Sequence, residues 1–351
     1  MCEQTGAMAA QTMYFTNDPH PNANAGDPSS TSALALAYRT YGEPGRPAVM
    51  MPTCYSGKLD TTLTWLWSAE ANGGLPPLLR DHFVVVCGLL GGSESSSPSN
   101  TAPALRGKHF PAVTYEDNVR LQHALCHSLG VTKLALYIGF SMGGQQAYHM
   151  ATLYPDFVER IVVLCSSART SSHNWCFLEG PRAALEESID FCDGDYVDTP
   201  RRGLRAFARC YATWALSSTW FRQRKWEALG FTSLKEYLRV AWEERTMAWD
   251  AHDLLVLMRT WQRGDISQFN AEGKEDDLRG TLASIKAKVL LMPCRTDLYF
   301  PPEDSEEEVK HLKNGELRVI ESVWGHLAGG GGGAKEDNAF IQSNVERLLA
   351  T

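Results

Sequence analysis

The chain has 351 residues, of which 44% are hydrophobic and 21% are charged, and its net charge is -8 at neutral pH. This composition is typical of a globular protein, and the length predicts one large domain with an insertion or two domains. The acidic balance, without a cluster of Lys or Arg, argues against nucleic acid as a partner, because phosphate groups need a basic stripe. It also gives no reason to expect binding to an anionic membrane.

Targeting signals and cysteine motifs are missing from the sequence. No apolar run reaches the roughly 20 residues that a membrane-spanning helix needs, and residues 1–6 do not fit a signal peptide. The nine cysteines are scattered without a C-x-x-C pair, so neither a zinc site nor a redox dithiol is indicated. Several, such as Cys87 and Cys165, lie in apolar strands as small hydrophobes. We therefore expect a cytoplasmic protein without a bound metal.

From about residue 31 the chain alternates short apolar runs with helical periodicity. This pattern is typical of a mostly parallel sheet with helices on both faces. The first 30 residues, rich in Asn, Pro, Ser, Gly and Ala, are expected to form a flexible N-terminal arm. The predicted strands are 32–41, 48–51, 83–87, 134–138, 161–165, 288–292 and 317–320, and the predicted helices are 115–129, 145–153 and 340–349.

The strand pattern stops between residues 167 and 270, where helical segments carry seven of the ten tryptophans. We interpret this segment as a helical lid inserted into a core formed by residues 31–166 and 271–351. It is expected to cover the carboxyl ends of the strands, where the chemistry of such sheets lies. Most of its tryptophans are expected to pack the lid helices together, and Trp175 and Trp249 are the candidates for lining a pocket.

The predicted strand 134–138 runs directly into Gly139-Phe-Ser-Met-Gly143, which fits the pattern G-x-S-x-G, and a helical segment follows. A nucleophile elbow requires this strand–turn–helix context. The glycines are needed because a Cβ on either side of the strained turn would collide with neighbouring backbone. A glycine-rich turn without a role for its serine is the alternative, but the flanking strand and helix favour Ser141 as a nucleophile.

A serine hydroxyl reacts well only when an imidazole removes its proton and a carboxylate holds that imidazole. On this architecture the acid and the base follow the serine in that order, each after a strand. Asp297 and His326 are the residues that meet this requirement. The rival acids Glu303 and Asp304 lie beyond two prolines in an acidic helix start, where carboxylates usually interact with the helix dipole.

The oxyanion of an acyl-transfer reaction needs preorganised N–H donors. One is expected to be the amide of Met142, directly after the nucleophile. The other is expected to be the amide of Cys54, in the loop after the predicted strand 48–51. No motif identifies this second donor, so Cys54 is inferred from topology alone. Tyr55 in the same loop and Phe140 in the elbow are further candidate substrate contacts.

These motifs resemble those of the homoserine O-acetyltransferase-like family of α/β-hydrolase-fold enzymes. The similar segments cover most of the chain from about residue 32 and include the elbow 139–147, the segment 110–117, the acid loop 297–301, the loop 91–99 and the lid segments 249–255 and 259–266. The resemblance implies an α/β-hydrolase fold with a helical lid and a ping-pong mechanism. Ser141 would take an acyl group from a thioester such as acetyl-CoA, and a hydroxyl deprotonated by His326 would then attack the acyl-enzyme.

One position departs from the family. Homoserine acetyltransferases carry an aspartate directly after the catalytic histidine, where it helps to hold the amino group of the substrate, and here this position is Leu327. A leucine cannot pair with an ammonium group. We therefore expect an acceptor or substrate less polar than homoserine, with Leu327 as a candidate contact.

Three functions are consistent with these residues. The first is an O-acyltransferase that moves an acyl group from a CoA-type thioester to a hydroxyl of a small, fairly apolar molecule, for example in secondary metabolism. The second is a hydrolase that uses water and the same triad to cleave an ester, a thioester or an activated C–C bond. The third, a non-catalytic binding protein, is opposed by the intact triad. The expected partner is a small molecule, no cofactor is expected to stay bound, and the oligomeric state is open, with a homodimer as one expectation.

Overall fold

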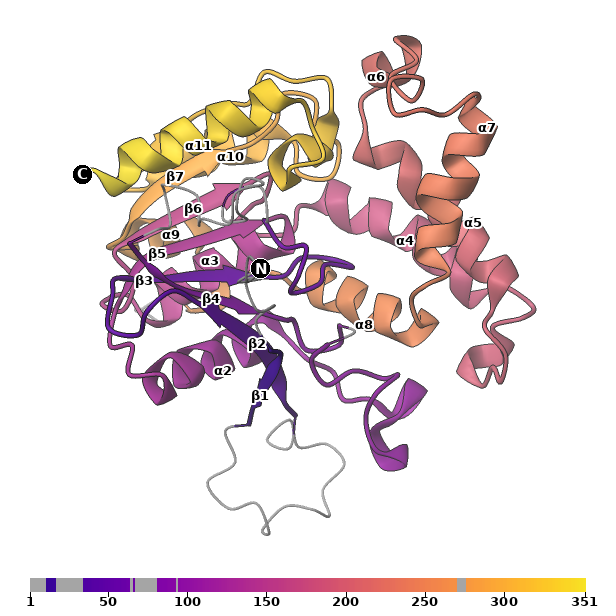
Figure 1. Cartoon of the computed structure of the whole chain (residues 1–351), viewed down its shortest axis with the longest axis horizontal. Coiled ribbons are helices and arrows are strands. Elements are labelled where there is room, and N and C mark those ends of the chain that lie inside the picture. Colours follow the sequence, from indigo (N-terminus) through magenta and orange to yellow (C-terminus); the bar gives the residue numbers. More distant parts are fainter. Residues whose placement is uncertain (1–10, 17–33, 64–65, 67–80, 93, 270–275) are drawn as a thin grey trace, which may run out of the picture.

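The computed structural model describes residues 11–16, 34–63, 66, 81–92, 94–269 and 276–351. The strands within these residues form one sheet, in the order β1-β2-β4-β3-β5-β6-β7-β8 (Figure 1). Strands β3 to β8 run parallel, and β2 runs antiparallel to β4. The strands are β1 (Met13–Phe15), β2 (Leu36–Tyr41), β3 (Ala48–Pro52), β4 (Phe83–Cys87), β5 (Leu134–Phe140), β6 (Arg160–Leu164), β7 (Lys288–Met292) and β8 (Gly315–Leu317).

The side chains of the central strands alternate between two apolar clusters, one on each face of the sheet, as the two-residue period of a strand requires. Met50 and Tyr137 pack into one cluster, whereas Val49 and Ile138 pack into the other. Because both faces are covered, β3 and β4 are buried along their whole length. Their continuous apolar sequence follows from this double burial.

Helices cover both faces of the sheet. Helices α2, α3 and α9 lie over one face and α11 lies over the other (Figure 1), and their side chains belong to the apolar clusters of those faces. Helix α2 begins with a capping box in which Thr114 and Asp117 bond to each other's backbone N–H. The core helices are α2 (Tyr115–Ser128), α3 (Met142–Leu153), α9 (Leu278–Ser284), α10 (Pro302–Glu308) and α11 (Lys335–Leu349).

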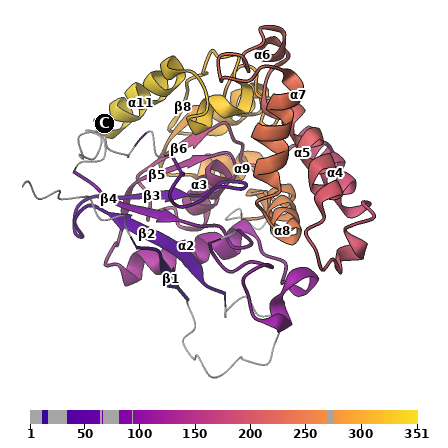
Figure 2. The ribbon, with the colours of Figure 1, turned by 45° about the vertical axis from the view of Figure 1, so that its right-hand side comes forward.

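The lid lies beyond the carboxyl ends of the parallel strands (Figures 1 and 2). Its interior is a third cluster, in which Trp220 and Trp261 are fully buried. The chain enters and leaves the lid through adjacent segments, since Thr170 N–H donates to the Gly264 carbonyl at 2.8 Å. The lid helices are α4 (Ser172–Glu186), α5 (Arg201–Ala215), α6 (Ser218–Arg222), α7 (Leu234–Tyr237), which continues as a π-helix (Leu238–Glu244), and α8 (Ala251–Gln262).

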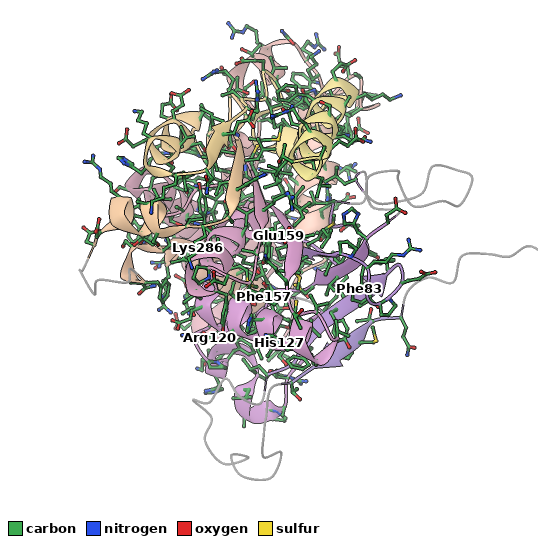
Figure 3. All side chains as sticks on the ribbon, turned by 90° about the vertical axis from the view of Figure 1, so that its left-hand side faces the viewer. Phe83, Arg120, His127, Phe157, Glu159 and Lys286 are labelled. Atoms are coloured by element: carbon green, nitrogen blue, oxygen red, sulfur yellow. The ribbon has the colours of Figure 1, made fainter. Side chains whose placement is uncertain are left out.

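Charged pairs lie at the amino ends of the parallel strands, on the side of the sheet away from the lid. Figure 3 views the molecule from the side away from the lid and labels Phe83, Glu159 and Lys286, which lie at or just before the amino ends of β4, β6 and β7. The ion pair of Lys286 with Asp156 (2.9 Å) is exposed there, and such pairs contribute little to stability. In parallel sheets the active site lies at the carboxyl ends of the strands, which here lie under the lid.

The predicted α/β architecture, with helices on both faces and a helical lid, is confirmed. Several predicted bounds are wrong: the strand predicted at 32–41 begins at Leu36, and the helices predicted at 145–153 and 340–349 begin at Met142 and Lys335. The last strand is residues 315–317 rather than 317–320, because its partner β7 ends at Met292 and Ile320 makes only an isolated bridge to Cys294. Residues 13–15, within the predicted flexible arm, form the edge strand β1, since pairing with β2 stabilises this short segment. Residues 1–10 and 17–30 of that arm lie outside the described residues.

Candidate active site

Ser141 lies at the sharp turn between β5 and α3, with φ 57° and ψ −124°. A non-glycine residue at positive φ is strained, and such strain is typical of active sites. The Ser141 N–H donates to the Leu164 carbonyl at the end of β6 (2.9 Å), which holds the turn against the sheet. A Cβ on Gly139 would lie 2.1 Å from backbone atoms of Gly143, so this position of the elbow requires glycine.

Asp297 lies in the loop after β7, and three donors hold its carboxylate. Oδ1 accepts from the backbone N–H groups of Tyr299 (2.8 Å) and Phe300 (3.1 Å). Oδ2 lies 2.8 Å from Nδ1 of His326. Because a carboxylate can only accept, this contact requires the proton on Nδ1 and leaves Nε2 as an acceptor. The predicted rival acids lie instead in the first turn of α10.

Aromatic rings contact the imidazole of His326 from the side of the core and from the side of the lid. The ring of Phe140, next to Ser141 in the chain, is 4.6 Å away between centroids. On the lid side, the rings of Tyr299 and Phe300 are 4.8 Å and 5.7 Å away. His326 is therefore only 4% exposed, and these contacts position the imidazole beside the elbow.

The glycine run after His326 allows its loop to lie directly against the elbow. A Cβ on Gly329 would lie 2.6 Å from Sγ of Cys165, and one on Gly330 would lie 2.7 Å from the ring of Phe140. Larger residues would separate the loop from the elbow. The glycines therefore serve the close approach of the two segments.

Backbone hydrogen bonds join the loops after β6, β7 and β8 at one edge of the sheet. Cys165 N–H donates to the Met292 carbonyl (3.1 Å), and Ile320 N–H donates to the Pro293 carbonyl (2.8 Å). The elbow is attached to the same edge through the end of β6. All three residues of the predicted triad consequently lie at this edge.

The two predicted oxyanion donors lie on segments that a glutamine links. Met142 is the first residue of α3, so its N–H has no intrahelical acceptor. Cys54 lies in the loop after β3. Gln146 of α3 donates to the carbonyls of Thr53 (3.2 Å) and Met142 (3.1 Å) and so joins this loop to the helix. Burial raises the pKa of the Cys54 thiol to about 12.

Three of the predicted substrate contacts, Tyr55, Trp249 and Leu327, pack in or against the lid cluster. The ring of Tyr55 stacks on Tyr211 of α5 with centroids 5.3 Å apart, and its hydroxyl donates to the Leu254 carbonyl (3.1 Å). Tyr55 thus joins the loop after β3 to two lid helices. Leu327 presents apolar surface on the lid side of His326.

The other two predicted contacts have different surroundings. Phe140 packs against the cluster under α11 and supports His326 from the side of the core. Trp175 is 48% exposed, because the buried face of α4 carries Asn174, Phe177 and Leu178. The structure does not bring Trp175 to the triad, and its prediction as a pocket residue is not supported.

Tyr299 and Phe300, the aromatic residues on the lid side of the base, are not among the predicted site residues. Tyr299 contacts His326, and its hydroxyl donates to the backbone carbonyl of Tyr211 on α5 (2.7 Å). Phe300 stacks on Trp261 of α8 with centroids 5.3 Å apart. A signal for them exists in the sequence, since they stand two and three residues after Asp297 in the acid loop. Through these two residues the acid loop contacts the lid.

Other groups in the described ranges have the following properties. No set of three or more His, Cys, Asp or Glu side chains there could hold a metal ion. The cysteines of these ranges are free thiols, and burial raises the pKa of Cys165 behind the elbow. None of the helices that the structure describes has both the length and the apolar character needed to cross a membrane.

Comparisons with known proteins give consistent results. A family profile described as alpha/beta hydrolase fold matches residues 47–185. The chain is 34% identical to ethyl acetate hydrolase of Pseudomonas veronii, covering 80% of this chain and 79% of that protein. It is 30% identical to homoserine O-acetyltransferase of Chloroherpeton thalassium, covering 83% and 78%. The solved structure of the acetyl esterase MekB matches 98% of this chain and 97% of its own, with a TM-score of 0.87 and 29% identity.

The fold and the residues at its elbow define an α/β-hydrolase-fold enzyme with serine-based catalysis. The interpretation as a non-catalytic binding protein is therefore set aside. Within this class, the chain belongs to the homoserine O-acetyltransferase-like family, in agreement with its motifs. Ester hydrolysis and acyl transfer both occur among the names of its relatives, so family membership alone does not choose between them.

Proposed function

We propose that this enzyme hydrolyses esters of short acyl groups, with acetate esters of small apolar alcohols as the preferred class. The observation that carries the proposal is Leu327, which follows His326 and packs against the aromatic lid cluster. In the homoserine acetyltransferases that the chain resembles, an aspartate here helps to hold the substrate's amino group. Leucine offers apolar surface instead. The similarity to a protein named ethyl acetate hydrolase supports the same substrate class.

In the proposed mechanism, Nε2 of His326 removes the proton from Oγ of Ser141 as this oxygen attacks the ester carbonyl carbon. Asp297 holds the imidazole through Nδ1 and stabilises the imidazolium that forms. The N–H groups of Met142 and Cys54 donate to the tetrahedral oxyanion. His326 then gives its proton to the leaving alcohol oxygen, and the acyl-serine remains. A water molecule, deprotonated by His326, attacks this acyl-enzyme and releases the acid.

A second candidate is O-acyl transfer, in which an alcohol replaces water in the second step. The similarity to a protein named homoserine O-acetyltransferase favours it. The donor would be a CoA-type thioester such as acetyl-CoA, as a co-substrate rather than a bound cofactor. Which acceptor reacts depends on how well the lid excludes water from the acyl-enzyme.

The acyl-enzyme offers a direct test of both candidates. After incubation with p-nitrophenyl acetate and rapid acid quenching, mass spectrometry should find an acetyl group on Ser141. A hydrolase releases it at a rate that added alcohols leave unchanged, whereas an acyltransferase releases it faster and forms the acetylated alcohol. Ser141→Ala should lower kcat at least about 10³-fold. An adduct that persists in Ser141→Ala would exclude Ser141 as the nucleophile.

The identity of the acceptor can be tested with homoserine. Supplied with acetyl-CoA and homoserine, the protein should form no measurable O-acetylhomoserine, because Leu327 cannot pair with the ammonium group. Product formation at a rate comparable to ester hydrolysis would contradict the proposed substrate class and would favour acyl transfer.

A further inference from the structure

A glutamine in the core contacts the peptide unit that carries the second proposed oxyanion donor. Gln146 is fully buried on α3, five residues after Ser141. Its side-chain amide donates to the carbonyl of Thr53 at 3.2 Å and to the carbonyl of Met142 at 3.1 Å. The Thr53 carbonyl and the Cys54 N–H belong to one peptide unit. In a trans peptide they point in opposite directions, so a bond to the carbonyl also sets the direction of the N–H.

The remaining polar groups of Thr53 are also engaged. Its N–H donates to the Cys87 carbonyl at 2.8 Å, and its Oγ1 accepts from the Leu89 N–H at 3.0 Å. These contacts fix the position of Thr53, which is 2% exposed. Rotation of the following peptide unit is opposed by the contact with Gln146.

Two further buried side chains orient the amide of Gln146. Its Oε1 accepts from Nε2 of Gln122 on α2 at 2.7 Å, and Oε1 of Gln122 accepts from the hydroxyl of Tyr137 on β5 at 2.7 Å. The order of donors and acceptors along these hydrogen bonds is set at Gln146. The carbonyls of Thr53 and Met142 can only accept, so they require the NH₂ group of Gln146 as their donor. Burial raises the pKa of Tyr137, which keeps its hydroxyl as a donor.

The hydrogen-bonded chain Tyr137–Gln122–Gln146 crosses the core between β5, α2 and α3, where most of the buried side chains are apolar. Burying polar side chains costs free energy unless each one finds a partner, and apolar residues of the same size could fill this space. Here each of the three side chains makes a hydrogen bond, and the chain ends at the loop after β3 that carries Thr53 and Cys54, called the oxyanion loop below. We propose that Gln146 is a positioning residue for the reaction, which aims the Cys54 N–H at the developing oxyanion, and that Gln122 and Tyr137 hold Gln146 in this orientation. The inference rests on the proposed function for its reaction.

The substitution Gln146→Met removes both donor bonds and keeps a side chain of similar length. It should lower kcat for p-nitrophenyl acetate about 10- to 100-fold and leave KM within about threefold, because loss of an oxyanion donor acts on the transition state. A trifluoromethyl ketone, whose adduct with Ser141 carries an oxyanion, should lose affinity in parallel with kcat/KM. A purely structural role would not produce this parallel loss.

Gln145→Met is the matched control. Gln145 is the adjacent residue of α3, is equally buried, and bonds to Tyr115 (2.7 Å) and Thr170 (2.9 Å) rather than to the oxyanion loop. Its substitution should lower Tm by an amount similar to Gln146→Met and leave kcat within about threefold. Equal losses of kcat in the two variants, or an unchanged ketone affinity in folded Gln146→Met, would overturn the inference.

A second variant covers the case in which Gln146→Met does not fold. In Gln146→Glu, a protonated carboxyl can donate one bond, whereas a carboxylate can donate none. Its kcat relative to the wild type should therefore decrease as pH rises and the new carboxyl ionises. A constant ratio between the two enzymes across the pH range would overturn the inference.

The proposed function and this inference can fail separately. A fluorophosphonate reacts with an activated serine, and its phosphoryl oxygen occupies the oxyanion site. If the wild type turns over no ester but is labelled on Ser141, the proposed function fails, and the labelling rate replaces kcat. Slower labelling in Gln146→Met than in Gln145→Met then supports the inference. A wild type that the fluorophosphonate does not label would overturn both.

Discussion

At the scale of single residues, Leu327 bears most directly on substrate choice. It lies directly after His326 and packs against the lid cluster, so Leu327→Asp would place a carboxylate in an apolar environment. We expect kcat/KM for p-nitrophenyl acetate to fall at least about tenfold, the loss that 1.4 kcal/mol of transition-state destabilisation produces. Leu327→Met keeps the size and polarity of the side chain and should stay within about threefold of the wild type. Full esterase activity in Leu327→Asp would contradict the proposed role.

Glu308 predicts a pH dependence of stability. It is buried on α10, where its carboxyl group contacts the hydroxyl of Tyr148 and the N–H of Ala168, both at 2.6 Å. Burial raises its pKa from 4.5 to about 8, although these hydrogen bonds oppose the shift. Between these values the folded state holds a proton that the unfolded state has lost. The stability that the protonated Glu308 contributes is therefore complete below the unfolded pKa of 4.5 and is lost as pH rises through the folded pKa of about 8.

The measurement is the Tm of the wild type and of Glu308→Gln between about pH 5 and about pH 8. The wild type should lose several degrees more than the variant over this range, since each pKa unit corresponds to about 1.4 kcal/mol. Parallel curves would show that Glu308 titrates normally in the folded protein. Because Ala168 lies where the chain enters the lid, the same contact ties the lid to α10.

At the scale of elements, a buried carboxylate fastens lid helix α8 to a loop of the core. Asp253, in the first turn of α8, accepts from the hydroxyl of Ser97 (3.1 Å) and from the N–H and hydroxyl of Ser99 (2.9 and 2.7 Å). Asp253→Ala would leave these donors without their acceptor and should destabilise the protein by about 2–4 kcal/mol. Hydrogen exchange should then accelerate in α8 and in residues 94–101 together.

The control for this prediction is Asp250→Ala in the same turn. Asp250 caps α8 by accepting from the N–H groups of His252 and Asp253, and it also accepts from the hydroxyl of Tyr196. Loss of such a cap costs about 1 kcal/mol and should accelerate exchange only in the lid. Equal exchange in the core loop of both variants would contradict a specific role for Asp253 as the link.

At the scale of the whole molecule, the sequence predicts the layers and the order of the chemical groups better than their contacts. Strands β4 and β7 have the predicted bounds because each is an apolar run buried on both faces. Strand β1 was not predictable, since its three residues depend on pairing with a strand more than twenty residues away. For the same reason the contact of Gln146 with Thr53 could not be derived, because spacing along a helix does not reveal which loop packs against it.

The burial of the site under the lid predicts selectivity for short acyl chains. Ser141 is 2% exposed, and the ring of Tyr299, which contacts His326, packs against the rings of Phe177 and Tyr211. A short acyl group can enter such a site with little displacement of these rings, whereas each added methylene needs more room. One misfitting methylene costs about 1–3 kcal/mol. We therefore expect kcat/KM to fall at least about tenfold from p-nitrophenyl acetate to the butanoate, and further with longer chains.

Truncation of the lid aromatics tests whether the lid causes this selectivity. Phe177→Ala opens space beside Tyr299, 4.8 Å away between ring centroids, and should reduce the ratio of acetate to hexanoate hydrolysis several-fold. Phe191→Ala creates a comparable cavity in the same cluster, where the ring contacts Tyr196 and His252 rather than the rings beside His326. Each variant should lose about 3–5 kcal/mol of stability, but only Phe177→Ala should change the ratio. An equal change in both would mean that general loosening of the lid, rather than the shape of the site, sets the chain length.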